Sequence, residues 1–507
     1  MIKCIAVFTA CLIFRLAHSQ GVAWSEPVKT TRDVVGVEVI STDDKGFFVA
    51  ELNKKEEALH VIRYNYSDMK PQWNRSIPIP SGQSGLEYEM IIHVKDKFML
   101  FTSGFEKESE QLQVFCTFYD NDCQKLSGPA LVHYTLSEGR TSAPLFGITL
   151  SPDSKHMLLY FDPPFERKTT EAISFKCYDA ELDMIWEKEI QLPYTQDIVQ
   201  VHKFLLDNTG NIYMMSGRNP LKQGVQWQKP QGGRYVVFFY GHKENKLKEY
   251  DISLKDKQVL SVAFDLNSAQ DVMITGYYSN DFKFSAAGTF LFVIGAYGTS
   301  VKAASFMPFP KDFLNKFLRQ SQVENDVKLP DFYLDHMMLA DDGTIILLGE
   351  QYYSTEYVIT DPTTGRQTVE HRYNFDDMIA TRLDANGRQT WNVKIPKRQF
   401  VTSGVETCSY QYFETPTGVQ IFFNDDPENQ QRLASLKESE ASTWNGSRNS
   451  VTTKVTVDKN GEFVRETLVS NKEQDALLKT TLGSLSGSGV RVLGYEDGRS
   501  YKFCVVR

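Results

Sequence analysis

The sequence predicts an all-β protein, specifically an eight-bladed β-propeller of four-stranded blades. Three observations lead to this fold class. A unit of strand, tight turn and strand recurs along the whole chain, helical periodicity is nearly absent, and a segment near the N-terminus repeats a pattern that the C-terminal unit lacks. Repeated four-stranded units that bury their faces against neighbours are typical of propellers.

The recurring unit is marked by its first turn, which is rich in Asp, Asn, Gly and Pro. Eight such turns are spaced 51 to 75 residues apart, centred on Lys45, Asp96, Ser154, Thr209, Ser268, Asp342, Thr417 and Ser488. Each is followed by a run of β-branched or aromatic residues, at 47–52, 98–102, 156–161, 212–215, 272–278, 344–348, 419–423 and 490–495. Such runs next to Asp/Gly turns predict β-hairpins.

One segment breaks the β pattern. Pro310 opens a stretch to Val323 in which Phe313, Leu314 and Phe317 recur at helical spacing. Because proline fits the first turn of a helix, we expect a helix over residues 310–323.

A tryptophan links the two ends of the chain. Trp73, Trp186 and Trp391 each follow a second turn, and an isoleucine stands four residues after each one. Trp24 and Val28 repeat this spacing before the first unit, whereas the eighth unit ends after its third strand. We therefore expect residues 24–28 to supply the outer strand of the last blade and to close the propeller.

The N-terminal segment suggests a compartment for the protein. Residues 1–19 combine Lys3, an apolar run and the small-residue pattern Ala17-His18-Ser19, as in a secretory signal peptide. No later stretch has the length of a membrane-spanning helix. We expect one propeller domain at 20–507 in a periplasmic or extracellular location.

The net charge and the cysteine content limit which partners and how many disulfide bonds we expect. The chain carries 55 basic and 64 acidic residues, a net charge of −9, which disfavours nucleic acid as a partner. Five cysteines remain after the leader, too few for a disulfide framework: Cys116, Cys123, Cys177, Cys408 and Cys504. We expect buried thiols with at most one or two bridges, and Cys116 with Cys123 is the one local pair to test.

Long loops of units four to seven suggest where a ligand binds. The loops at 216–233, 308–330, 351–373, 397–407 and 425–449 fall on one face of a propeller, where binding commonly occurs. The richest set of polar residues there comprises Glu350, Gln351, Tyr352, Tyr353, Lys397, Arg398, Gln399, Asn424, Asp425 and Asn429. Their acids, amides, phenols and cations would suit a protein, peptide or glycan ligand. The alternative is an ion-paired framework in which Lys397 and Arg398 neutralise Glu350 and Asp425.

The sequence lacks the motifs that would identify a zinc site, a catalytic serine or a phosphate-binding loop. There is no His-Glu-x-x-His pair, no Gly-x-Ser-x-Gly elbow and no glycine-rich phosphate loop, so we expect no metal and no cofactor. The leading hypothesis is a non-enzymatic binding or assembly scaffold. The alternative is a polysaccharide hydrolase or lyase using Glu350 with Asp425 or Asp426, which requires carboxyl groups about 5 to 10 Å apart.

Two resemblances add to these expectations. Segments 339–353, 377–387, 391–399 and 421–425 resemble uncharacterised secreted propeller-like proteins of the Bacteroidetes, most specifically over residues 332–507. This resemblance implies secretion and carries no assigned reaction. Asp384-Ala-Asn-Gly387 with Trp391 is similar to quinoprotein-type repeats, which include quinone-dependent dehydrogenases and an outer-membrane assembly scaffold. The chain lacks the vicinal cysteines of many such dehydrogenases, which disfavours the enzyme branch, and the scaffold branch is an analogy of fold alone.

Overall fold

The computed structural model describes residues 21–79, 85–136, 145–162, 165–166, 168–179, 181, 183–218, 234–254, 256–280, 285–360, 362–435, 441–485 and 489–507. The predicted leader and most of the predicted loop at 216–233 lie outside these residues. The chain forms two compact units, one of Met1–Ile77 with Leu482–Arg507 and one of Pro78–Thr481.

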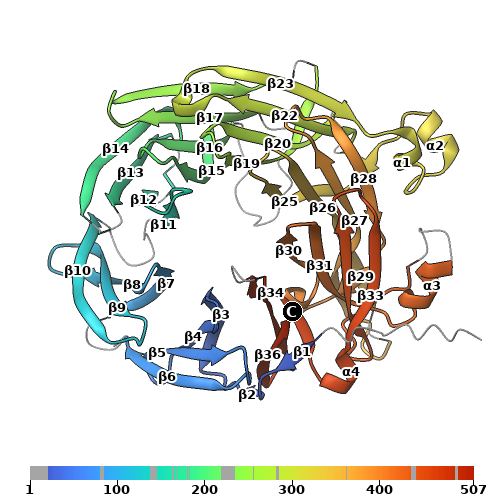
Figure 1. Ribbon diagram of the computed structural model, residues 1–507, viewed down its shortest axis with the longest axis horizontal. Coiled ribbons are helices and arrows are strands. Elements are labelled where there is room, and N and C mark those ends of the chain that lie inside the picture. Colours follow the sequence, from blue (N-terminus) through green and yellow to red (C-terminus); the bar gives the residue numbers. More distant parts are fainter. Residues whose placement is uncertain are drawn as a thin grey trace, which may run out of the picture. The chain divides into compact units, whose positions relative to one another are not determined.

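The larger unit contains six sheets with four consecutive main strands each, all antiparallel and in chain order (Figure 1). The first sheet consists of β7 (Glu87–Val94), β8 (Lys97–Glu106), β9 (Gln111–Asp120) and β10 (Lys125–Leu136). The second consists of β11 (Leu145–Leu150), β12 (His156–Asp162), β13 (Thr170–Asp179) and β14 (Met184–Thr195). The third consists of β15 (Val199–Leu206), β16 (Ile212–Arg218), β17 (Arg234–Gly241) and β18 (Lys246–Ile252). The fourth consists of β19 (Gln258–Leu266), β20 (Val272–Ser279), β22 (Gly288–Ile294) and β23 (Val301–Pro308). The fifth consists of β25 (Phe332–Leu339), β26 (Ile345–Thr360), β27 (Gln367–Leu383) and β28 (Gln389–Ile395), and β29 (Gln399–Val401) also pairs with β27. The sixth consists of β30 (Gln411–Thr415), β31 (Gly418–Asp425), β32 (Val451–Asp458) and β33 (Phe463–Ser470).

The smaller unit contains the first and last parts of the chain. One sheet consists of β3 (Val34–Thr42), β4 (Gly46–Asn53), β5 (Ala58–Asn65) and β6 (Pro71–Pro78). The other consists of β34 (Leu477–Leu485), β35 (Arg491–Glu496) and β36 (Ser500–Val506), with β1 (Val22–Trp24) and β2 (Val28–Lys29) paired to β36. The boundaries between the two units fall within β6, after Ile77, and within β34, after Thr481.

The predicted turns join first and second strands, and their side chains explain why they form. Asp207 is typical, because its Oδ1 accepts hydrogen bonds from the backbone N–H groups of Thr209 at 2.8 Å and Asn211 at 3.0 Å. A short carboxylate that bonds the backbone ahead of it stabilises a reversal of the chain. Seven of the eight predicted turn centres lie in such connections, while Ser488 lies outside the described residues.

The core lies between consecutive sheets, since alternate residues of each strand face the neighbouring sheet. One cluster joins Leu158, Ile173 and Phe175 of the second sheet to Ile212 and Met214 of the third. Similar clusters join the other neighbouring sheets of the larger unit. The faces that the apolar patterns predict as buried are therefore covered by the next sheet in the sequence.

The N-terminal segment pairs with the last strand, as expected from Trp24. Trp24 lies opposite Cys504, and Val28 lies opposite Tyr501 (Figure 1, β1 and β36). Ser25 N donates to Phe503 O at 2.9 Å. Residues 24–28 thus complete the sheet that β34, β35 and β36 begin.

The predicted helix at 310–323 is two short helices, α1 (Lys311–Leu314) and α2 (Gln320–Glu324). They are separate because Arg319 is extended, with φ −67° and ψ 149°, and its N–H bonds the side chain of Gln322 at 2.9 Å. The apolar spacing nevertheless serves burial, since Phe313, Leu314 and Val323 pack in one cluster. The remaining short elements are β21 (Ser285–Ala286), β24 (Leu329–Pro330), α3 (Asn429–Ser435), α4 (Asn471–Gln474) and the 3-10 turns Ala296–Gly298 and Val405–Thr407.

All five cysteines of the described chain are buried and unbridged, including Cys116 and Cys123. Among the described residues, we find no helix with both the length and the apolar character needed to cross a membrane. The same residues contain no group of three side chains placed to hold a metal ion.

Candidate functional site

Glu350, Gln351, Tyr352 and Tyr353 lie on β26, and Glu350 forms a buried ion pair with Lys397, which lies between β28 and β29. The Lys397 Nζ atom lies 2.5 Å from Glu350 Oε1, with side-chain exposures of 0% and 4%. Lys397 Nζ also donates to the carbonyl of Phe375 at 3.0 Å and to Gln399 Oε1 at 2.9 Å. Of the two ion pairs that the alternative interpretation predicts, the pair between Lys397 and Glu350 is therefore present.

The second predicted ion pair differs, because Asp425 pairs with Arg465 and not with Arg398. The two side chains are 1% and 7% exposed. Asp425 also accepts hydrogen bonds from Asn429 Nδ2 at 2.7 Å and Thr453 Oγ1 at 2.9 Å. No sequence pattern pointed to Arg465, which comes from β33 and reaches Asp425 only through the pairing of β31, β32 and β33.

The predicted amides bond backbone groups inside the protein. Gln399 Nε2 donates to Asn424 O at 2.7 Å. Asn424 Nδ2 donates to Thr407 O and Leu478 O, each at 2.8 Å. Because these groups are buried, their hydrogen bonds avoid the cost of unpaired polar atoms. In this arrangement Gln399, Asn424 and Asn429 hold loops to the sheet.

A further acid, Asp335 of β25, adjoins the ion pair. Its Oδ2 accepts a hydrogen bond from Tyr410 OH at 2.9 Å. Removal from bulk water and the charge of Glu350 raise the pKa of Asp335 well above its usual value, and Tyr410 and Lys397 oppose this rise only in part. Burial raises the pKa of Glu350 as well, and the charge of Lys397 opposes that rise. The sequence signal was a lone acid in an otherwise apolar and aromatic stretch.

The remaining predicted residues are partly or fully accessible and lie where β26 and β27 leave the sheet. Tyr353 OH donates to Asp376 Oδ2 at 2.9 Å, and burial together with Asp376 raises the pKa of Tyr353 to about 12. Tyr352 packs on Phe375 with ring centroids 4.9 Å apart. Gln351 bonds a backbone carbonyl at 3.1 Å, and Arg398 is exposed. The predicted set therefore divides into a buried framework and an accessible margin.

The predicted loop at 351–373 is mostly β structure. β26 and β27 continue as a two-stranded ribbon, residues 354–360 and 367–373, with partners from Ser354 with Tyr373 to Thr360 with Gln367. The β-branched and aromatic residues of both segments explain this extension. Four large apolar side chains of the ribbon are 47% to 61% exposed: Tyr357, Val358, Ile359 and Val369. In the described chain, β29 pairs with β27 only at residues 373–375, so most of both ribbon edges is unpaired.

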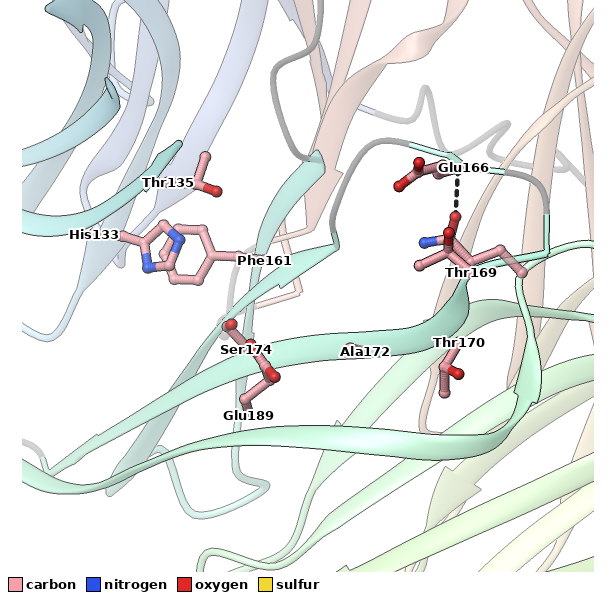
Figure 2. Close-up of a pocket in the computed structure, with 10 residues that line it drawn as sticks. His133, Thr135, Phe161, Glu166, Thr169, Thr170, Ala172, Ser174 and Glu189 are labelled. Carbon is pink, nitrogen blue, oxygen red and sulfur yellow. Dashed lines mark hydrogen bonds between the residues drawn. The ribbon is translucent and has the colours of Figure 1, made fainter. Parts of the chain in front are cut away.

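A separate pocket of about 230 Å³ lies between the sheet of β10 and the sheet of β13 (Figure 2). It is lined by His133, Thr135, Phe161, Glu166, Thr169, Thr170, Ala172, Ser174, Glu189 and Gln196. No sequence motif marks this pocket, because its residues come from β10, β12, β13 and β14 and from the adjoining loops.

No family model and no curated protein matches the chain, so the resemblance to secreted Bacteroidetes proteins stays an expectation. The chain is similar to prolyl oligopeptidase B from Galerina marginata at 9% identity and TM-score 0.41, covering 94% of this chain and 55% of that one. It is similar to oligopeptidase B from Leishmania major at 9% identity and TM-score 0.38, covering 91% and 53%. It is also similar to the β-propeller domain of the Trilobed protease from Pyrococcus furiosus at 11% identity and TM-score 0.33, covering 89% and 97%. The chain spans about half the length of the two oligopeptidases.

Proposed function

We propose that this chain is a non-enzymatic binding scaffold outside the cytoplasm, which engages a protein partner through the ribbon. In this proposal the chain is an eight-bladed propeller closed by its N-terminal strands. The eight sheets of four or five strands and the pairing of β1 with β36 support that architecture. The predicted leader supports the location.

The observation that carries the proposal is the exposed apolar surface of the ribbon. Val358 and Val369 are direct cross-strand partners, yet they are 61% and 52% exposed. Exposed apolar side chains gathered on one element are typical of interaction surfaces. Glu356 and His371, 3.6 Å apart, are the adjacent cross-strand pair and supply a polar margin, as at protein interfaces.

The chemistry favours a protein strand over a glycan. Three of the four exposed apolar side chains of the ribbon are β-branched, and Tyr357 is the single aromatic residue among these four. The open backbone edges of the ribbon provide donors and acceptors for an added strand. Gln351, Tyr352, Tyr353 and Arg398 lie at the base of the ribbon and would extend the contact.

The hydrolase alternative has less support. Its acids Glu350 and Asp425 are buried and each is paired with a cation, and only Asp426 is half-buried. General acid catalysis requires a carboxyl group that reaches the substrate.

Site-specific crosslinking tests the proposal. The full mature chain would carry a photoreactive amino acid at Tyr357 or, as the control, at Val464, which is 64% exposed on β33. A partner crosslinked from Tyr357 would be purified and its affinity measured for the wild type, Val358→Lys/Val369→Lys and Val464→Lys. We expect loss of binding only in the ribbon variant. Equal affinity of all three, or crosslinking solely to a second copy of this chain, would reject a separate protein as the occupant.

A further inference from the structure

We propose that the pocket in Figure 2 binds an organic cation, namely the ammonium groups of an aliphatic polyamine or the cationic side chain of a peptide. This site is separate from the ribbon and does not depend on the function proposed for it.

The pocket is built on strands. Thr170, Ala172 and Ser174 are alternate residues of β13 and share one face, which forms the floor. Glu189 of β14 lies directly across from Ser174. Because the floor belongs to a paired sheet, the positions of these groups are defined before a ligand arrives.

A buried amide holds the loop at the other end. Gln196 is only 7% exposed, and its Oε1 accepts the backbone N–H of Glu166 at 2.5 Å. This bond, dashed in Figure 2, fixes the backbone of Glu166 and leaves its carboxylate free to meet a ligand.

The lining of the pocket contains acidic side chains and no basic side chain other than His133. Glu166 and Glu189 are its carboxylates, and the lining residues include no lysine or arginine. Burial and Lys176 lower the pKa of His133 to about 4, so this imidazole is neutral. The nearby cation Lys176 is itself paired with Glu187 at 3.5 Å. The uncompensated carboxylates favour a cation.

An aromatic wall complements the carboxylates. The His133 ring stacks on Phe161 with centroids 3.6 Å apart and an interplanar angle of 12°. Aromatic faces attract ammonium and guanidinium groups and also accommodate methylene chains. In Figure 2, Glu166 and Glu189 lie toward opposite ends of the pocket, with Ala172 between them. Separated charges joined by an aliphatic segment fit a polyamine.

Calorimetry on the full mature chain tests this inference with spermidine, putrescine, the blocked amides of lysine and arginine, and glucose as the neutral control. We expect saturable spermidine binding that weakens with added salt. Glu166→Gln/Glu189→Gln should weaken it at least about tenfold. The control Glu108→Gln/Glu181→Gln removes the same charge from exposed turns outside the pocket and should bind normally.

Two further variants give independent readings. Ala172→Phe fills the floor without changing charge and should abolish binding, with circular dichroism verifying the fold. Val358→Lys/Val369→Lys should bind spermidine normally, which separates this site from the ribbon. Absence of amine binding, or equal loss in both charge variants, would overturn the inference. Binding of the lysine or arginine amide in preference to spermidine would identify a peptide side chain as the source of the cation.

Discussion

Lys397 and Glu350 form an ion pair inside the protein, with 2.5 Å between Nζ and Oε1 and almost no solvent exposure of either side chain. Asp335 lies nearby with a raised pKa, because burial and the Glu350 charge both disfavour its ionised form. Burial raises the pKa of Glu350 too, and Lys397 opposes the rise at both acids. The balance between burial and the charge of Lys397 therefore governs how readily each acid ionises.

Removal of the Lys397 charge should show how much this ion pair stabilises the folded protein. We expect Lys397→Met to lower the free energy of unfolding by about 3–5 kcal/mol, because Glu350 would remain buried without a counter-charge. Adding Glu350→Gln should restore much of the loss. Urea unfolding of the single and double variants measures the coupling, and exposed Arg398→Met is the control. Losses that simply add would show that the two side chains do not interact.

The pairing of the N-terminal segment can be tested with the native thiol of Cys504. Trp24 is its partner, and the adjacent Ser25 is hydrogen-bonded to Phe503, so Trp24 and Cys504 form a non-hydrogen-bonded pair. Such pairs bring Cα atoms to about 4.5 Å, within the range for a disulfide. Trp24→Cys should therefore crosslink to Cys504 on mild oxidation, as mass spectrometry would show. Ala23→Cys, which faces the other side of the strand, should not. A folded Trp24→Cys variant that stays reduced would contradict the register.

Gly461 should be needed for the contact between a turn and Trp391. Its φ is +83°, and an added Cβ would lie 2.7 Å from Trp391 Cγ. We expect Gly461→Ala to lose more stability than the about 1–3 kcal/mol of backbone strain alone. Gly365→Ala is the matched control, since Gly365 has φ +68° and no atom within 4 Å of the added Cβ. Thermal unfolding compares them, and equal losses would show that the Trp391 contact contributes nothing.

Stability should fall as pH rises through the range in which Glu171 keeps its proton in the folded state. Burial, followed by the charge of Asp162, raises the pKa of Glu171 from 4.5 to about 8. Between these values the unfolded chain releases the proton and the folded chain keeps it, so raising the pH favours unfolding up to about pH 8. Glu171→Gln should flatten this dependence and be more stable than the wild type at pH 8. Urea unfolding at pH 5, 6.5 and 8 measures the slopes, with Glu181→Gln as the control. Parallel slopes for wild type and Glu171→Gln would refute the assignment.

Local sequence was sufficient where the interactions are local. Asp207 and its counterparts bond backbone groups two to four residues away, so their turns and the strands around them could be predicted. The apolar spacing at 310–323 predicted a helix, but the helix is interrupted at Arg319 by an extended backbone that its N–H bond to Gln322 stabilises. The ribbon was predicted as a loop, since the pairing of Val358 with Val369 depends on strands meeting beyond the sheet.

The candidate site was harder to predict because charge partners are chosen in three dimensions. Lys397 and Arg398 are consecutive, yet one is buried against Glu350 and the other is exposed. Arg465 reaches Asp425 only because two strand pairings carry β33 beside β31. The pocket of His133, Ser174 and Glu189 has no motif at all, because sheet register and the packing of two sheets assemble it.

The sequence by itself determined the repeat of strands and turns and the pairing of the first strand with the last, since both follow from spacing and from local hydrogen bonding. Only the tertiary structure decided which charges are buried, which residues are exposed on the ribbon and where a pocket forms. Those properties depend on distances between strands that are remote in the chain, and burial changes the energy of a charge far more than its neighbours in sequence do.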